Sequence, residues 1–536
     1  MSSQSSVTLP AGENGGHNLE EGDMEYRYLT FDTYISSLSQ ERLTKYSEAG
    51  HTSPPRPPDL KPYISPFLWS SGRKNAIVWL GVFAAGLASH AAGSYTSAAT
   101  EMAKDWGIGR IAVMVGVTTF TTGFAVAPML LAPFSEINGR YPVFICAGLL
   151  FVIGQICCAV TRSYAGMLVA RFVTGVGSSV FSSMVGGVIS DLYKNEERNT
   201  PMALFSLGAL FGTGTGPLCS GFIVQRTDWR WVFWSQAIAN GVLVSAFALC
   251  YRETRGEVLL KRKARSLNLW YDELELRGYK PLDDFPLEHN SSRIQRRYRW
   301  QVKSATQKKS FLKMITLSLY RPFRLLFTEP ILFSFSLWVT FAWAVLYITF
   351  SSIPIVFAKN HDFDLEQGGA VFTSICVGSL LAVIVELTQQ KLFPNVSKVG
   401  SETAPERRLY FTCVEGVLLP AGLFWFGWTQ FSSIPWIVPA LGVGCATMGI
   451  FWIYLSTFNY LADIYQSYAS SALAAQSFCR NLVGGIFPLV TPALFNNLGF
   501  QEASSLLGGI AVLLTLVPWL LVLRGPTIRS WSKYTV

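Results

Sequence analysis

The chain has 536 residues, of which 50% are hydrophobic and only 14% are charged, with nine cysteines and a formal net charge of +9. A soluble protein has about a quarter of its residues charged, so the composition argues against a water-soluble globular protein. Because the charges are confined to a few polar stretches, the positive charge indicates membrane topology and contact with an anionic leaflet rather than nucleic-acid binding.

Long apolar runs surround two polar segments, residues 1–74 and 252–328. A helix of about 20 apolar residues crosses the roughly 30 Å hydrocarbon core of a bilayer. Twelve such runs are present, six on each side of the second polar segment, so we predict an all-α membrane protein of two halves. The predicted spans are 75–97, 111–133, 142–161, 165–190, 202–224, 232–251, 329–356, 367–387, 409–428, 434–460, 471–495 and 504–523.

The distribution of Lys and Arg predicts which side each segment occupies. If the N-terminus is cytoplasmic, most of these residues fall on the cytoplasmic side, in agreement with the positive-inside rule. We therefore expect a disordered cytoplasmic tail (1–74), a first half (75–251), a cytoplasmic central loop (252–328), a second half (329–524) and a cytoplasmic C-terminal tail (525–536). All cysteines fall in predicted spans, which indicates buried thiols rather than disulfides.

The turn between the second and third predicted spans holds an acid and a base. Glu136, Gly139 and Arg140 lie within this turn. Glycine permits a tight turn, and the carboxylate of Glu136 could dock on the N-terminus of a neighbouring helix. These residues are candidates for a cytoplasmic gate, and the alternative interpretation is a solvated turn.

The fourth predicted span contains one charged residue, Arg171. A buried arginine costs about 2.5–3.5 kcal/mol on insertion scales, so it usually faces a cavity or a partner. We predict a functional role for Arg171, with snorkelling to the outer headgroups as the alternative.

Glycines recur every four residues in the fifth predicted span. Gly208, Gly212 and Gly216 therefore share one helix face, followed by Pro217 and Gly221. A bare face lets a neighbouring helix approach closely, and proline bends a helix. The pattern predicts a tightly packed, kinked helix, which could be a pivot between the two halves or a helix that only packs closely.

The second half has a similar interruption at Gly484–Pro488 in the eleventh predicted span. Matching interruptions in two halves are typical of a central binding site. Glu386 and Glu415 lie near the inner ends of their spans, and we interpret them as wetted helix ends. The candidates for a substrate cavity are Tyr95, Tyr347, Tyr454, Arg480 and Asn481.

Together these motifs resemble the major facilitator superfamily, and within it the fungal drug:proton antiporter family with twelve spans. Gly208–Gly221 is similar to the antiporter motif of the fifth span, Arg171 with Gly175 to the fourth-span motif linked to proton coupling, and Ser135–Pro142 to the loop between spans two and three. The loop departs from that pattern at Ala132, Ile137 and Tyr141. The resemblance covers nearly all of residues 75–533.

The resemblance implies two six-helix bundles around a cavity that opens alternately to each side of the membrane. It further implies proton-driven export of small organic compounds, with Arg171 in coupling. We expect a protein of the plasma membrane, with the vacuolar membrane as the alternative. The expected partners are a small-molecule substrate, protons and the lipid bilayer, with a monomer as the functional form.

Two alternatives remain open: an importer or polyamine-type carrier on the same fold, and a non-transporting membrane sensor. The polyamine version would need a deep acidic cluster, which the predicted spans do not contain. We expect no enzyme activity, cofactor or metal, because the polar segments show no nucleotide loop, metal-ligand spacing or nucleophile–base constellation.

Overall fold

The computed structural model describes residues 24–33, 55–194, 196–277, 297–303, 311–393, 405–530, 532 and 534. The chain forms two compact units. A small unit combines Met1–Ser65 with Glu257–Lys308, and a large helical unit combines Pro66–Gly256 with Lys309–Val536.

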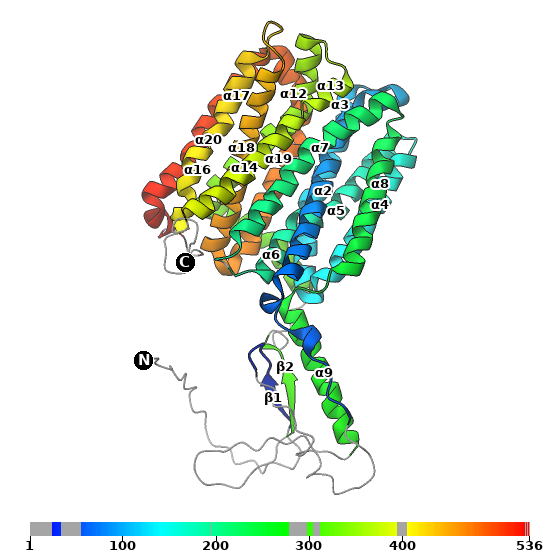
Figure 1. Cartoon of the computed structure of the whole chain (residues 1–536), viewed down its shortest axis with the longest axis vertical. Helices are drawn as coiled ribbons and strands as arrows, with labels where there is room; N and C mark the ends of the chain where they lie inside the picture. Colours follow the sequence, from blue (N-terminus) through cyan, green and yellow to red (C-terminus); the bar gives the residue numbers. More distant parts are fainter. Residues whose placement is uncertain are drawn as a thin grey trace. The chain divides into compact units, whose positions relative to one another are not determined.

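The helical unit contains both halves of the predicted membrane region (Figure 1). The helices of its first half are α2 (Ser71–Trp106), α3 (Arg110–Asn138), α4 (Arg140–Val160), α5 (Tyr164–Ser183), α6 (Val185–Leu192), α7 (Asn199–Arg226) and α8 (Arg230–Cys250). Those of its second half are α11 (Phe311–Thr328), α12 (Pro330–His361), α13 (Leu365–Ala370), α14 (Thr373–Leu392), α16 (Leu409–Glu415), α17 (Leu418–Thr429), α18 (Ile437–Tyr465), α19 (Ala469–Leu498) and α20 (Phe500–Arg529). Short 3-10 turns lie at Lys61–Tyr63, Pro66–Leu68, Pro405–Arg408 and Gln466–Tyr468.

Twelve helices in the described residues are long and apolar enough to cross a membrane, which confirms the predicted number of spans. Three of them are interrupted: α5 continues into α6, α13 into α14, and the turn at Pro405–Arg408 into α16 and α17. Six spans precede the central segment and six follow it, and the two halves lie side by side as predicted (Figure 1).

Glycine sets two of the sharp connections. Gly107 ends α2 with a φ of 62°, and its N–H bonds to the carbonyls of Ala103 and Lys104. Gly139 joins α3 to α4 with a φ of 99°. Residues with a Cβ atom rarely adopt a positive φ, so glycine is the residue that suits both connections.

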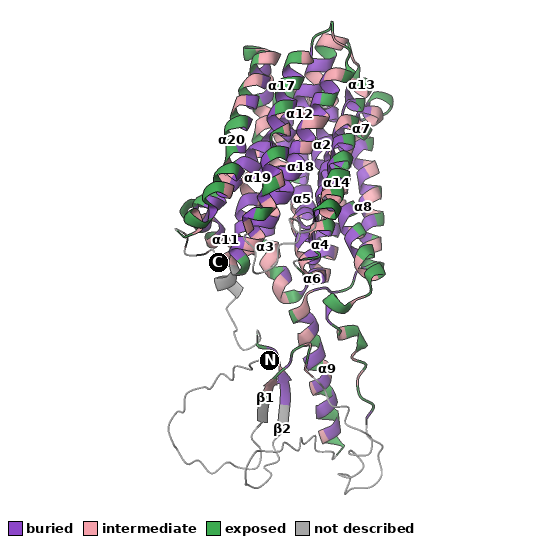
Figure 2. Ribbon diagram, turned by 60° about the vertical axis from the view of Figure 1, so that its left-hand side comes forward, coloured by how far each residue is buried: buried purple, intermediate pink, exposed green. Residues whose placement is uncertain are grey.

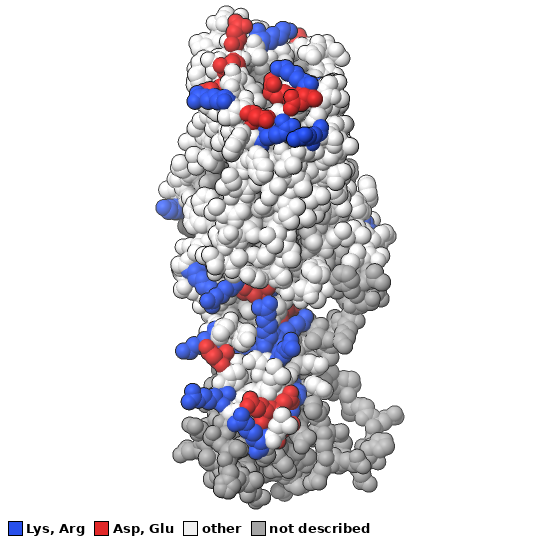
Figure 3. All heavy atoms as spheres, turned by 90° about the vertical axis from the view of Figure 1, so that its right-hand side faces the viewer, with Lys and Arg blue, Asp and Glu red and all other residues white. Residues whose placement is uncertain are grey.

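The burial pattern is that of helices surrounded by lipid. Buried residues fill the interior of each half, while the outward faces carry exposed apolar side chains such as Leu249, Leu513 and Leu523 (Figure 2). On the face shown in Figure 3, a broad band of the helical unit is nearly free of charged residues. An apolar outer band of this kind is what a bilayer requires.

The halves contact each other along two seams. One joins α3 to α19, and the other joins α7 to α13 and α14. In the first seam the Thr118 hydroxyl donates to the Gly485 carbonyl across 2.8 Å. The space between the two seams is where a central site can form.

The small unit is a feature that the sequence analysis did not anticipate, because it treated 1–74 as a tail and 252–328 as a loop. Strand β1 (Met24–Tyr28) pairs in parallel with β2 (Arg297–Gln301), with Met24 opposite Arg297. Helix α9 (Gly256–Leu276) contributes side chains, among them Trp270, to the buried apolar cluster of this unit. The domain boundaries stay a prediction.

Candidate functional site: a central cavity and two charge networks

A cavity of about 1210 Å³ lies between the two halves. Pro128 on α3 and Ser182 on α5 line it from the first half, while Tyr454 on α18 and Arg480 on α19 line it from the second. The cavity extends to the helix ends that carry Asp191, the end predicted to be cytoplasmic. A cavity between helices of two repeats is a common place for a ligand site.

The halves are in contact at the opposite end. Arg226 of α7 makes a bidentate ion pair with Glu366 of α13, at 3.0 and 2.6 Å. Beside it, a Cβ added at Gly221 would approach the Leu365 carbonyl oxygen to 2.9 Å. The structure therefore has the cavity open towards one end and closed at the other.

Arg480 is the charged residue farthest inside the cavity. Its guanidinium carbon lies 4.4 Å from the ring centre of Trp343 and 4.7 Å from that of Tyr454. The side chain is only 3% exposed, and its Nε and Nη1 find no hydrogen-bond partner among the described residues. A cation between aromatic faces gains some stabilisation but keeps its donors free.

Arg171 is fully buried inside the first half, where it does not reach the headgroups. Its Nε donates to the Gly116 carbonyl at 3.3 Å and its Nη1 to the Ala91 carbonyl at 3.1 Å. The guanidinium also lies against the rings of Tyr95 and Phe120, at 4.6 and 4.4 Å. Arg171 thus ties α2, α3 and α5 together, so the snorkelling alternative does not describe this conformation.

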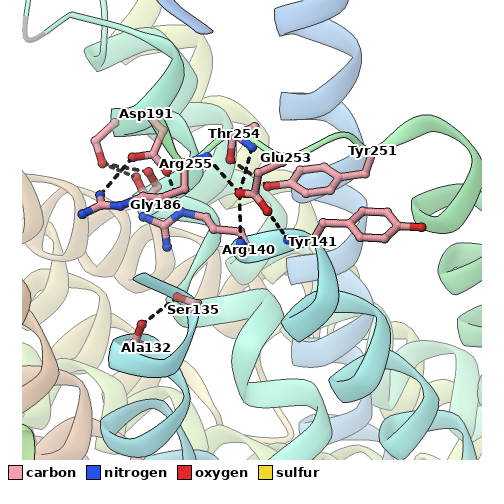
Figure 4. Close-up of polar contacts among 12 residues, drawn as sticks. Ala132, Ser135, Arg140, Tyr141, Gly186, Asp191, Tyr251, Glu253, Thr254 and Arg255 are labelled. Carbon is pink, nitrogen blue, oxygen red and sulfur yellow. Dashed lines mark hydrogen bonds and ion pairs between the residues drawn. The ribbon is translucent and has the colours of Figure 1, made fainter. Parts of the chain in front are cut away.

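Arg140 belongs to a charge network at the predicted cytoplasmic end of the first half (Figure 4). Its Nε lies 2.5 Å from a carboxylate oxygen of Asp191, and Arg255 approaches the other oxygen to 3.4 Å. Glu136 lines the cavity nearby but forms no ion pair among the described residues. The acid that pairs with Arg140 therefore comes from the end of α6, not from its own turn.

The carboxylate that docks on a helix N-terminus is Glu253. It accepts hydrogen bonds from the backbone N–H groups of Arg140, Tyr141, Thr254 and Arg255, at 2.9 to 3.3 Å (Figure 4). A negative charge at the start of α4 is favoured by the helix dipole. A Cβ at Gly139 would collide with this carboxylate, so the glycine is needed for both its φ and its space.

An equivalent network lies in the second half and reaches the first. Asp463 at the end of α18 pairs with Arg408 at 2.5 Å and with Arg198 at 3.3 Å. Arg408 also donates to the amide oxygen of Asn199. Because Arg198 and Asn199 stand at the start of α7, this network fastens that helix to the second half.

The glycine face of α7 packs on α2, a helix of the same half. A methyl group at Gly208 would approach the Val82 carbonyl oxygen to 2.5 Å, and one at Gly216 would approach the His90 carbonyl oxygen to 2.7 Å. Gly212 faces the Gly86 carbonyl in the same way. The predicted close packing is present, whereas the contacts to the other half come from different positions of α7.

Those contacts involve the other side of the helix. A Cβ at Gly214 would approach Cys376 Sγ to 2.8 Å, and one at Gly369 would approach the Pro217 carbonyl oxygen to 3.1 Å. Helix α7 therefore has one glycine-lined side on α2 and another small-residue side on α13 and α14.

Glu415 is not a wetted helix end, since it is 8% exposed. It accepts a hydrogen bond from Gln389 at 2.5 Å. Glu386 accepts from Gln390 at 2.9 Å and from the Trp452 indole at 3.2 Å. Both carboxylates line a small cavity of about 60 Å³ between α14, α16 and α18, and each accepts a hydrogen bond from an amide side chain of α14.

The remaining candidates lie beside the cavity rather than on its wall in this conformation. The Tyr95 hydroxyl donates to the Val113 carbonyl at 3.0 Å inside the first half. Tyr347 is buried on α12 against Phe350. The Asn481 amide donates to the Ser477 carbonyl of its own helix at 2.8 Å. Of the five candidates, Tyr454 and Arg480 are the ones that line the cavity.

Sequence reasoning missed Glu253 and the partners of Arg140. The signal in the sequence is an acid at a predicted cytoplasmic helix end, which Glu253, Asp191 and Asp463 share. Just after the end of α8 at Cys250, burial raises the pKa of the Tyr251 phenol, so this group stays protonated and hydrogen-bonds with Thr254 at 2.9 Å.

Twelve membrane helices in two halves around a cavity define a secondary transporter. Residues 78–488 match the model of the Major Facilitator Superfamily, and the chain belongs to that family. It is therefore an integral membrane protein that crosses the bilayer several times.

Known proteins agree with this assignment. The chain is 33% identical over 432 residues to the MFS transporter paaT of Penicillium rubens, covering 80% of this chain and 74% of that protein. It is 34% identical over 425 residues to the efflux pump radE of Floropilus chiversii, covering 78% and 74%. The solved structure of the proton:xylose symporter XylE matches with a TM-score of 0.59 at 16% identity, covering 85% of this chain and 97% of that one, and shows a shared fold.

Proposed function

We propose that the chain is a proton-coupled exporter of small organic compounds that works by alternating access. The observation that carries the proposal is the cavity between the two halves, which is lined by aromatic and polar residues and is closed at the end predicted to be extracellular. Relatives named efflux pumps support export as the direction.

The exporter would bind its substrate in this cavity from the cytoplasm and release it after the halves rock. Substrate and proton would each favour a different state, so that the proton gradient moves the substrate outward. We assign Glu136, Gly139 and Arg140 to the cytoplasmic gate, and place the protein in the plasma membrane as a monomer with both termini in the cytoplasm.

Arg171 is our candidate for coupling. It is buried between three helices of the first half, and its Nη2 has no hydrogen-bond partner among the described residues. A charge that is held by backbone carbonyls and ring faces responds to small movements of those helices. This would let proton binding and helix movement influence each other.

The test is transport of a fluorescent organic compound into inverted membrane vesicles that carry the full-length protein. A pH gradient, acid inside, should drive uptake, and Arg171→Ala should abolish it while membrane insertion remains. Arg162→Ala, which changes an exposed arginine between α4 and α5, is the matched control. Gradient-independent uptake by the unmodified protein would refute coupling, and full activity of Arg171→Ala would remove Arg171 from it.

Neither alternative is favoured by a specific observation. The importer predicts net movement in the opposite direction in the same vesicles, and the sensor predicts no substrate movement by purified protein in proteoliposomes. The acidic residues on the cavity wall lie near helix ends, whereas a polyamine carrier would need acidic residues deep in the cavity.

A further inference from the structure

The charges on the cavity wall are sorted by depth. Its acidic residues are Glu136, Asp191, Glu196 and Asp463, all at or beyond the helix ends. Arg480 is the eleventh residue after the start of α19 at Ala469, which places it about 16 Å along the helix at 1.5 Å per residue. Among the described wall residues, the deep part of the cavity therefore carries a positive charge with no acid beside it.

The positive charge at this depth is not neutralised. Arg480 forms no ion pair among the described residues, and two of its nitrogens lack a hydrogen-bond partner there. Leaving a buried charged donor unpaired is costly, so such a donor requires a partner, which can be water, an ion or a ligand. A guanidinium matches the two oxygens of a carboxylate with two parallel hydrogen bonds.

A second free donor lies one turn away on the same helix. Gln476 also lines the cavity, is 3% exposed, and its Nε2 has no partner among the described residues. Residues four apart lie on one helix face, so the Gln476 amide and the Arg480 guanidinium are neighbours. Both free groups donate, and a ligand that complements them must accept.

The surroundings of these donors are aromatic. Tyr454 and Phe458 are one turn apart on α18, and both line the cavity. Trp343 lies against the Arg480 guanidinium from α12. A flat apolar body can lie on these rings while its charged group reaches the donors.

We propose that the substrate class is an aromatic organic anion, with its carboxylate bound by Arg480 and Gln476 and its ring held by Tyr454 and Phe458. This rests on the proposed function, since it names the kind of compound that the exporter takes. The pairing of Arg480 with a ligand also explains why a buried arginine stands here without an acidic partner.

Three probes with the same ring and different charges test this inference: 1-naphthoate, 1-naphthamide and 1-naphthylmethylamine. Binding to the purified full-length protein is measured by calorimetry. We expect naphthoate to bind at least about tenfold more tightly than the other two, because hydrogen bonds between charged groups are stronger than those to a neutral amide. Equal binding of all three probes, tighter binding of the amine, or no binding of naphthoate would overturn the inference.

Variants of the donors make the test specific. Arg480→Gln keeps much of the side-chain length and removes the charge, so it should lose the preference for naphthoate. Arg480→Lys keeps the charge without the planar fork and should bind naphthoate with intermediate affinity. Arg162→Gln serves as the control, and thermal unfolding of each variant shows whether it is folded. Unchanged naphthoate binding by folded Arg480→Gln would overturn the role of Arg480.

A third variant covers the case in which Arg480→Gln does not fold. Gln476→Glu places a carboxylate one turn from Arg480, which should pair with the guanidinium and weaken naphthoate binding about tenfold or more. Unaltered binding would count against the site. Failure of the proposed function can be distinguished from failure of this inference. If the chain is not an exporter, none of the three probes shows gradient-driven flux. If only the substrate class is wrong, the amine is transported and the anion is not preferred.

Discussion

Buried arginines in this chain are stabilised in three different ways. Arg140 has a carboxylate partner, Asp191, at 2.5 Å. Arg171 has two backbone carbonyls and two aromatic rings. Arg480 has the rings of Trp343 and Tyr454 without an acid. The three arginines therefore differ in partner: a carboxylate for Arg140, backbone carbonyls and rings for Arg171, and rings alone for Arg480.

The first prediction concerns the carboxylate at the start of α4. Glu253→Ala removes the acceptor of four backbone N–H groups, so it should lower the stability of the protein by about 1–3 kcal/mol. The midpoint of thermal unfolding in detergent measures the change. Glu257→Ala, at an exposed acid in the first turn of α9, is the control and should shift the midpoint much less, because an exposed first-turn acid contributes only about 0.3–1 kcal/mol. A shift no larger than that of the control would show that Glu253 is dispensable for this helix start.

The identity of these charged residues could be predicted from sequence, but not their partners. Arg171 and Arg140 stand out because a charge in or beside an apolar span is unusual. Glu253 lies more than a hundred residues from Arg140, and only the fold brings the two together. A sequence pattern on a single helix cannot report that distance.

At the scale of the element, α7 shows how a spacing pattern translates into packing. Its four-residue glycine repeat predicted a bare face, and the face is occupied by the backbone of α2. The partner helix was not predictable, because a glycine face fits any apolar helix. The same helix touches the second half through Gly214 and Pro217, so it contacts both halves of the membrane region.

The second prediction uses this difference between glycines. Gly212→Ala places a methyl group against the Gly86 carbonyl, so it should cost about 1–3 kcal/mol and slow transport in vesicles. Gly241→Ala on α8 has open space and should leave transport unchanged. Transport of the fluorescent compound and thermal unfolding are measured for both variants. Equal behaviour of the two would mean that α2 and α7 are free to separate.

For the whole molecule, the apolar runs predicted all twelve spans because a bilayer imposes length and composition on every helix that crosses it. The small unit escaped prediction because its two strands lie on either side of the first six spans in the sequence, with Met24 opposite Arg297. Short strands so far apart give no local periodic signal that links them. Arg299 is held there by Asp272 and Glu275 of α9, at 2.7 and 2.9 Å.

The third prediction concerns the movement of the two halves. Helix α7 is fastened to the second half at both of its ends, by Arg226–Glu366 and by Arg198–Asp463. Alternating access requires the halves to separate at each end in turn, so Arg226–Glu366 should favour closure of the end that is closed here. Arg198–Asp463 is formed although the cavity is open towards its end, so it holds the start of α7 to the second half without closing the cavity. Removing either pair should loosen α7 at that end.

Glu366→Gln should therefore raise amide hydrogen exchange in residues 218–226 and 365–370, by up to about fivefold, because an exposed ion pair contributes about 0.2–1 kcal/mol. Asp463→Asn should instead raise exchange at the start of α7, where Arg198 loses its ion pair and Arg408, which binds Asn199, loses its own. Glu502→Gln, at an exposed acid on α20, is the matched control. The measurement uses the full-length protein in lipid nanodiscs. If both variants raised exchange at the same end, the two ion pairs would not act as separate latches, and rocking about α7 would have to be abandoned.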